Sequence, residues 1–77
     1  MSDLATALGH LEAGDWEAAH VIVQEDDTPL AAWAHGIVHI MEGDMANAGY
    51  WYRRAGRPLP AAVQVAAELA ALRAALG

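Results

Sequence analysis

Small residues and one proline recur at a regular spacing in the middle of the chain. Gly36, Gly43, Ala48, Ala55 and Pro60 lie 7, 5, 7 and 5 positions apart. Small side chains allow two antiparallel helices to approach closely, and a large aromatic side chain can fill the gap beside them. The spacing therefore indicates two packed helices that are joined near Gly43 and end before Pro60.

The boundary between those two helices has a counterpart earlier in the chain. The tripeptide Gly14-Asp15-Trp16 is matched by Gly43-Asp44-Met45. In both, a glycine is placed to end one helix, an aspartate to cap the next, and a bulky residue to open it. We therefore expect two helical hairpins, over about 3–26 and 29–56.

Capping signals and helical periodicity divide the whole chain into five segments. Ser2 or Asp3 is placed to cap the first helix, and Thr28 followed by Pro29 is a start signal for the third. The expected helices end near 13, 25, 42, 55 and 76, and the last begins near 59. No segment has the pattern of a strand. The predicted fold is all-α, with two stacked antiparallel hairpins and a C-terminal capping helix.

Tyr52 lies between Ala48 and Ala55, where the predicted packing needs an aromatic residue. With it, the spacing over about 29–62 resembles the tetratricopeptide repeat. The chain also resembles a family of small bacterial proteins, through the segments 16–20 and 35–57 and their AH…HxxxHxxEGDxxNAxYWYRRAG pattern. These resemblances imply a helical-repeat fold and no activity.

Composition excludes several classes of function. The 77 residues suffice for one domain, 1–77, and the absence of cysteine excludes disulfides and thiolate metal sites. A net charge of −6 would repel a nucleic-acid backbone. No apolar run is long enough to span a membrane, and the N-terminal segment carries no Lys or Arg of a targeting peptide. We expect a soluble cytoplasmic protein without a cofactor.

Three histidines and a glutamate are the strongest candidates for a site. On the expected helix 29–42, His35, His39 and Glu42 fall within about 60° of one another. Histidines four residues apart can reach one metal ion, and His20 on the preceding helix could supply another ligand. The alternative without a function is that these are polar residues on the solvent-facing or concave side of the array. The functional alternatives are a concave surface that binds a protein, peptide or small ligand, and a metal-binding or hydrolytic site.

Tyr50 and an arginine cluster lie close to these histidines in the sequence. Arg53, Arg54 and Arg57 are three of the four basic residues. At the end of a helix they complement its dipole, and they could balance the acidic run 25–27 or form an anion site. Tyr50 is expected to point away from the core near Arg54. The candidate partner-binding residues are His20, His35, His39, Glu42, Tyr50 and Arg53, with no residue assigned as catalytic.

The expected C-terminal helix carries two apolar stripes. One consists of Val63, Ala66 and Ala70, and the other of Val65, Leu69, Leu72 and Leu76. A terminal helix packed on one neighbour needs a single stripe. The second stripe predicts a self-association surface and a homodimer. The alternative is that the helix packs deeply between two others and uses both stripes internally.

Overall fold

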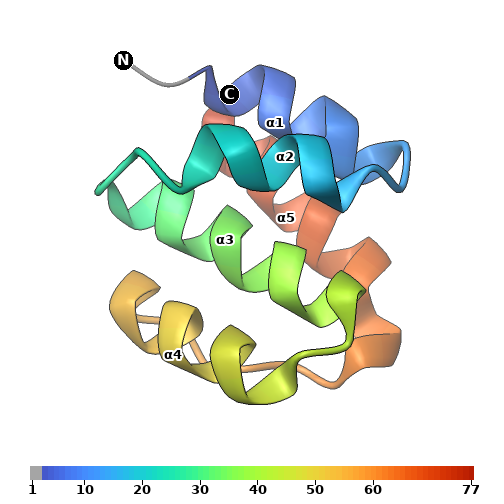
Figure 1. Cartoon of the computed structure of the whole chain (residues 1–77), viewed down its shortest axis with the longest axis vertical. Coiled ribbons are helices and arrows are strands. Elements are labelled where there is room, and N and C mark those ends of the chain that lie inside the picture. Colours follow the sequence, from blue (N-terminus) through green and yellow to red (C-terminus); the bar gives the residue numbers. More distant parts are fainter. Residues whose placement is uncertain (1–2) are drawn as a thin grey trace.

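The computed structural model describes residues 3–77, and these form helices without any strand. The elements are α1 (Leu4–Glu12), α2 (Trp16–Val23), α3 (Pro29–Glu42), α4 (Met45–Ala55), a short 3-10 helix (Ala62–Gln64) and α5 (Val65–Leu76) (Figure 1). The expected all-α fold of five helices is confirmed. None of these helices has the length and apolar character needed to cross a bilayer.

The predicted capping residues lie at the helix starts. The side chains of Asp3, Asp15, Thr28 and Asp44 each accept a hydrogen bond from the backbone N–H three residues further on. Gly43 and Gly56 follow α3 and α4 in the left-handed conformation, with φ of 93° and 74°. Ser2, the other candidate cap of α1, lies outside the described residues. Local signals therefore account for where most of these helices begin and end.

The helices pair as two stacked hairpins. α1 packs against α2, α3 packs most extensively against α4, and α2 also lies against α3 (Figure 1). Gly36 sets the closeness of the α3–α4 contact, because a Cβ atom at this position would lie 2.6 Å from Cε1 of Tyr52. Tyr52 itself is fully buried. The predicted packing of an aromatic ring against a small residue is therefore present between these two helices.

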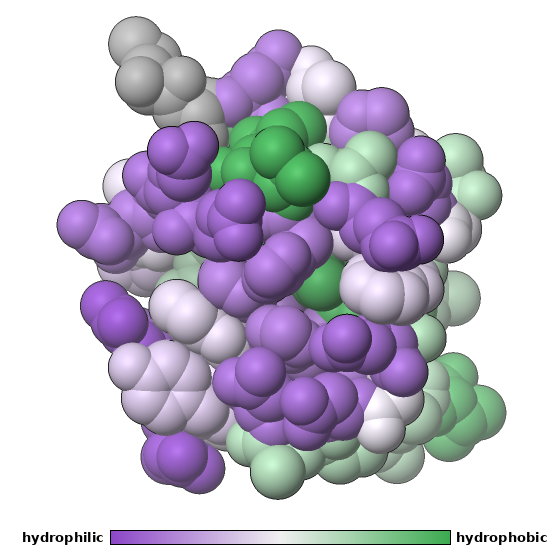
Figure 2. Space-filling model, in the orientation of Figure 1, coloured by the Kyte–Doolittle hydropathy of each residue, from purple (hydrophilic) through white to green (hydrophobic). Residues whose placement is uncertain are grey.

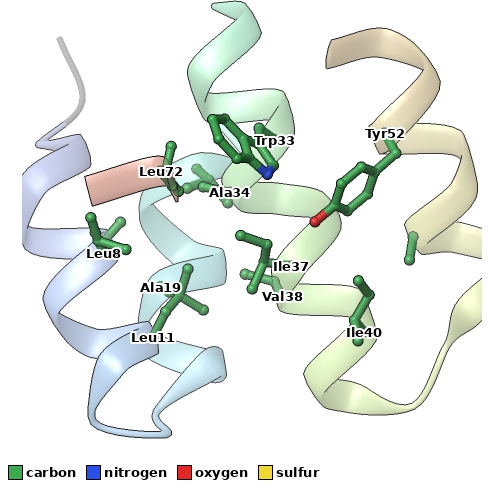
Figure 3. Close-up of a cluster of buried hydrophobic side chains, with 13 residues drawn as sticks. Leu8, Leu11, Ala19, Trp33, Ala34, Ile37, Val38, Ile40, Tyr52 and Leu72 are labelled. Carbon is green, nitrogen blue, oxygen red and sulfur yellow. The ribbon is translucent and has the colours of Figure 1, made fainter. Parts of the chain in front are cut away.

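All five helices contribute to one hydrophobic core. Figure 3 shows Leu8 and Leu11 of α1 facing the side chains of α3, with Leu72 of α5 close to Ala34. Leu72 has no exposed surface, although it lies on a terminal helix. α5 is thus an integral part of the core.

This position of α5 corrects the predicted self-association surface. Val65, Leu69 and Leu76 are partly buried and pack on the core around Leu72, whereas the other stripe, Val63, Ala66 and Ala70, is exposed. The reason is that α5 packs against both α1 and α3, so the larger side chains are needed between the helices. The stripe predicted to form a dimer contact therefore packs against helices of the same chain.

The segment before α5 is also less helical than expected. The helix predicted from about 59 begins with a 3-10 turn at Ala62, and Ala61 is extended, with φ of −68° and ψ of 148°. Arg57 and Leu59 each precede a proline, Pro58 and Pro60, and a residue that precedes proline is biased away from the helical region, which disfavours a helix that starts near 59. Figure 2 shows hydrophobic atoms gathered at the lower right, where Figure 1 places the start of α5. Similarly, α2 ends at Val23, two residues before the expected end.

Candidate functional site: a histidine cluster between α2, α3 and α4

Three imidazole rings meet where α2 packs against α3. The ring centroid of His20 is 4.9 Å from that of His35 and 5.4 Å from that of His39. The His35 and His39 rings, one helical turn apart, stack with centroids 5.0 Å apart. One possible ligand nitrogen from each ring lies within 4.8 Å of the other two. The structure thus brings together the three histidines that their spacing placed on facing helices.

The cluster is buried, which corrects the expectation of an open concave face. His35 is 4% exposed and His39 is 7% exposed, while His20 is partly buried. The reason is the central position of α3, which contacts each of the other four helices. Every residue of α3 from Ala31 to Ile40 is consequently buried. His35 and His39 therefore do not line an open groove.

An aromatic side chain from α4 covers the cluster. The indole of Trp51 stacks on the imidazole of His35, with centroids 3.8 Å apart and ring planes inclined by 9°. This contact was not predicted from the sequence. The stacking depends on how α3 and α4 cross, and spacing along either helix does not specify that crossing.

The arginines of α4 interact with aromatic rings. The guanidinium carbon of Arg54 lies 5.1 Å from the ring centroid of Trp51, and its Nη1 donates a hydrogen bond of 3.3 Å to the Tyr50 hydroxyl. The expected proximity of Tyr50 and Arg54 is confirmed, and Tyr50 is 44% exposed. Arg53 is exposed as well. Tyr50 and Arg53 are the exposed aromatic and basic members of the candidate partner-binding set, and the expected binding of a protein, peptide or small ligand stays a prediction.

Burial keeps one imidazole of the cluster neutral. Burial, followed by the nearby charges of His39, His20 and Arg54, lowers the pKa of His35 from 6.5 to about 4. The Nδ1 atom of His35 is buried and has no hydrogen-bond partner. A neutral, buried ring nitrogen without a partner is an unusual feature, because buried polar atoms are nearly always hydrogen-bonded.

A carboxylate orients the second histidine of α3. Nδ1 of His39 lies 2.8 Å from Oε1 of Glu42. A carboxylate oxygen accepts hydrogen bonds, so Nδ1 of His39 is the donor in this pair, and Nε2 is the ring nitrogen that is left to bind a metal. Asp44 lies beside this pair, and one ligand atom each of His39, Glu42 and Asp44 fall within 4.8 Å of one another.

The side chains gathered here have the chemistry of ligands in a nitrogen-rich metal site. Imidazoles are common ligands of Zn²⁺, Cu²⁺ and Ni²⁺. A carboxylate bonded to the remaining N–H of a ligating histidine is the usual outer partner in such sites. The residues that could hold a metal are His20, His35 and His39, with Glu42 as the orienting carboxylate.

Comparisons with family models, with curated proteins and with solved structures gave no match for this chain. The resemblances to the tetratricopeptide repeat and to the small bacterial family therefore stay predictions.

Proposed function

We propose that this protein binds a divalent transition-metal ion through His20, His35 and His39. The observation that carries the proposal is the buried Nδ1 atom of His35, which has no hydrogen-bond partner and belongs to a ring that faces two further imidazoles. Leaving such an atom unpaired costs about 1–3 kcal/mol. A metal bound at this nitrogen would remove that cost.

The protonation state of the cluster supports the same proposal. Imidazole must be neutral to bind a metal, and His35, with a pKa of about 4, is neutral at pH 7. The bond between His39 and Glu42 leaves Nε2 of His39 as the free nitrogen. An all-imidazole set selects Zn²⁺, Cu²⁺ or Ni²⁺ over Mg²⁺ and Ca²⁺, which prefer oxygen ligands.

Only a modest closure of the three rings is required. Two nitrogens at about 2.0–2.1 Å from one tetrahedral Zn²⁺ lie about 3.4 Å apart. The possible ligand atoms of the cluster lie within 4.8 Å of one another. His20 is the least constrained of the three, because it is partly buried and comes from a separate helix. Rotation of its side chain would complete the site.

Calorimetric titration with Zn²⁺ tests the proposal directly. We expect one ion per chain. His20→Ala removes the ligand that comes from α2, and it should lower the affinity for Zn²⁺ by at least about tenfold. The matched control is His10→Ala, because His10 lies on α1 and belongs to neither group of possible ligands. The proposal fails if the wild-type protein releases no heat, or if both variants bind as the wild type does.

A further inference from the structure

Charge is distributed unevenly along the chain. Nine of the ten acidic residues lie in the segment 3–44, which contains no Lys or Arg, and the tenth is Glu68. The segment 45–67 has the opposite character, because it contains no acidic residue and carries Arg53, Arg54 and Arg57. Figure 1 shows α4 along one edge of the molecule, with α3 between it and α2. The basic groups are therefore gathered on α4 and on the turn that follows it.

The arginines of this segment have no carboxylate partner. Within residues 3–77, the only ion pair of an arginine joins Arg73 to Glu12. Arg53, Arg54 and Arg57 are exposed and belong to no such pair. Cations in the last turn of a helix complement its dipole, but that interaction does not occupy the N–H groups of a guanidinium. Most of these donors are therefore available to an anion from outside the chain.

Aromatic rings hold two of the guanidinium groups in place. The guanidinium carbon of Arg57 lies 3.5 Å from the ring centroid of Trp33, and that of Arg54 lies 5.1 Å from the ring centroid of Trp51. Such a contact uses the flat face of the guanidinium, so the donors in its plane can still bind a carboxylate. Side chains that are ordered before binding also lose less conformational entropy when a ligand arrives.

Apolar surface adjoins these cations. Tyr50 is 44% exposed and Leu59 is 41% exposed. A Cβ atom at Gly49 would lie 3.6 Å from Nη1 of Arg53 and 3.7 Å from Cδ2 of Leu59, so these two side chains meet over Gly49. A small anion would use only the cations of this surface. A peptide that carries both carboxylates and apolar side chains would use all of it.

We propose that this surface binds an acidic peptide segment of another protein. The arginine face, defined as Tyr50, Arg53, Arg54, Arg57 and Leu59, takes carboxylates on its guanidinium groups and an apolar side chain on its tyrosine or leucine. Clusters of arginine are a recurring means of recognising acidic motifs, and a guanidinium can bind a carboxylate through two parallel hydrogen bonds. A nucleic acid is a poorer match, because a long polyanion would also approach the nine acidic residues of 3–44.

Titration of ¹⁵N-labelled protein, followed by nuclear magnetic resonance, tests this proposal. The probe is a short peptide of glutamate with interspersed leucine, and a chelator is present so that the histidine cluster does not contribute. We expect saturable shift changes centred on the amides of residues 50–59. Arg53→Gln and Arg57→Gln should each lower the affinity for the peptide about fivefold or more. The matched control is Arg73→Gln, which removes the same charge outside the arginine face and should leave the affinity unchanged.

The spectra also show whether each variant is folded, and Arg53→Gln serves as the test if the loss of Arg57 from the ring of Trp33 disturbs the fold. The proposal is overturned if the peptide shifts no amide of the arginine face, or if its glutamine analogue binds equally well. Equal losses of affinity in all three variants would overturn it too, since they would indicate a response to net charge alone. So would tighter binding of a single-stranded DNA oligonucleotide at the same residues, which would assign the arginine face to nucleic acid.

Discussion

Acidification should destabilise this protein through His35. Burial is the main cause that lowers the pKa of this histidine from 6.5 to about 4 in the folded state. The unfolded chain therefore binds the proton more tightly than the folded chain does. The contribution of neutral His35 to stability is complete above about pH 6.5 and is lost as the pH falls towards 4.

The magnitude follows from the two pKa values. With 6.5 for the unfolded and about 4 for the folded state, the free energy of unfolding falls by about 2 kcal/mol between pH 7 and pH 5. The loss levels off at about 3 kcal/mol below pH 4. A domain of this size has a total stability of about 4–12 kcal/mol, so the effect is a large share of it.

Urea unfolding followed by circular dichroism at pH 7 and pH 5, in the presence of a chelator, measures this loss. The comparison variant is His35→Phe, which keeps a flat ring against Trp51 and cannot take up a proton. Because His20 and His39 are retained, the difference between wild type and variant isolates His35. At a slope of about 1 kcal/mol per molar urea, the wild-type midpoint should fall about 2 M further than that of the variant. An equal shift of both midpoints would refute the reasoning.

Three further substitutions probe the packing and the candidate site. Gly36→Ala should destabilise the protein by about 2 kcal/mol or more in thermal unfolding, because the added methyl group meets the ring of Tyr52. The control is Gly9→Ala, which should be neutral or stabilising because no atom lies within 4 Å of the added methyl group. Tyr52→Phe removes the 2.7 Å hydrogen bond to Glu68 and should cost about 1–2 kcal/mol in urea unfolding. Glu42→Gln weakens the hydrogen bond that orients His39, and it should lower the affinity for Zn²⁺ in calorimetry about tenfold or more. An unchanged affinity would show that this hydrogen bond does not influence metal binding.

Helix boundaries could be predicted from the sequence wherever the signal is local. An aspartate or threonine caps each of the first four helices, and Gly43 and Gly56 adopt the left-handed conformation for which glycine is suited. The boundary at the start of α5 was misplaced. There the alanine-rich composition favours a helix, but Arg57 and Leu59 each precede a proline and are therefore biased away from the helical conformation.

The buried face of α5 could not be predicted in the same way. Its two apolar stripes are both compatible with a helix packed on a neighbour, and the choice depends on how α5 crosses α1 and α3. Leu72 is buried and Val63 is 87% exposed because of that crossing. The hydrogen bonds of Glu68 could not be predicted either, because only the fold brings Trp33 and Tyr52 within reach of it.

The candidate site shows the same division between local and tertiary information. The spacing of His35 and His39 predicted a shared face, and the packing of α2 on α3 adds His20. The burial of the cluster and the stacking of Trp51 arise from contacts between α3 and its neighbours. Those contacts argue against an open groove at His35 and His39, and they leave the metal site, which the sequence analysis had given as an alternative, as the proposal for these histidines.

The complete covering of α3 has a consequence for the dynamics of the protein. The ten residues from Ala31 to Ile40 are all buried. If one neighbouring helix detaches, the other helices still cover the rest of α3. Its central amide protons should exchange with solvent only when the whole molecule unfolds. Hydrogen exchange at these amides would then report the global free energy of unfolding, while α5, joined through an extended segment, would report its own detachment.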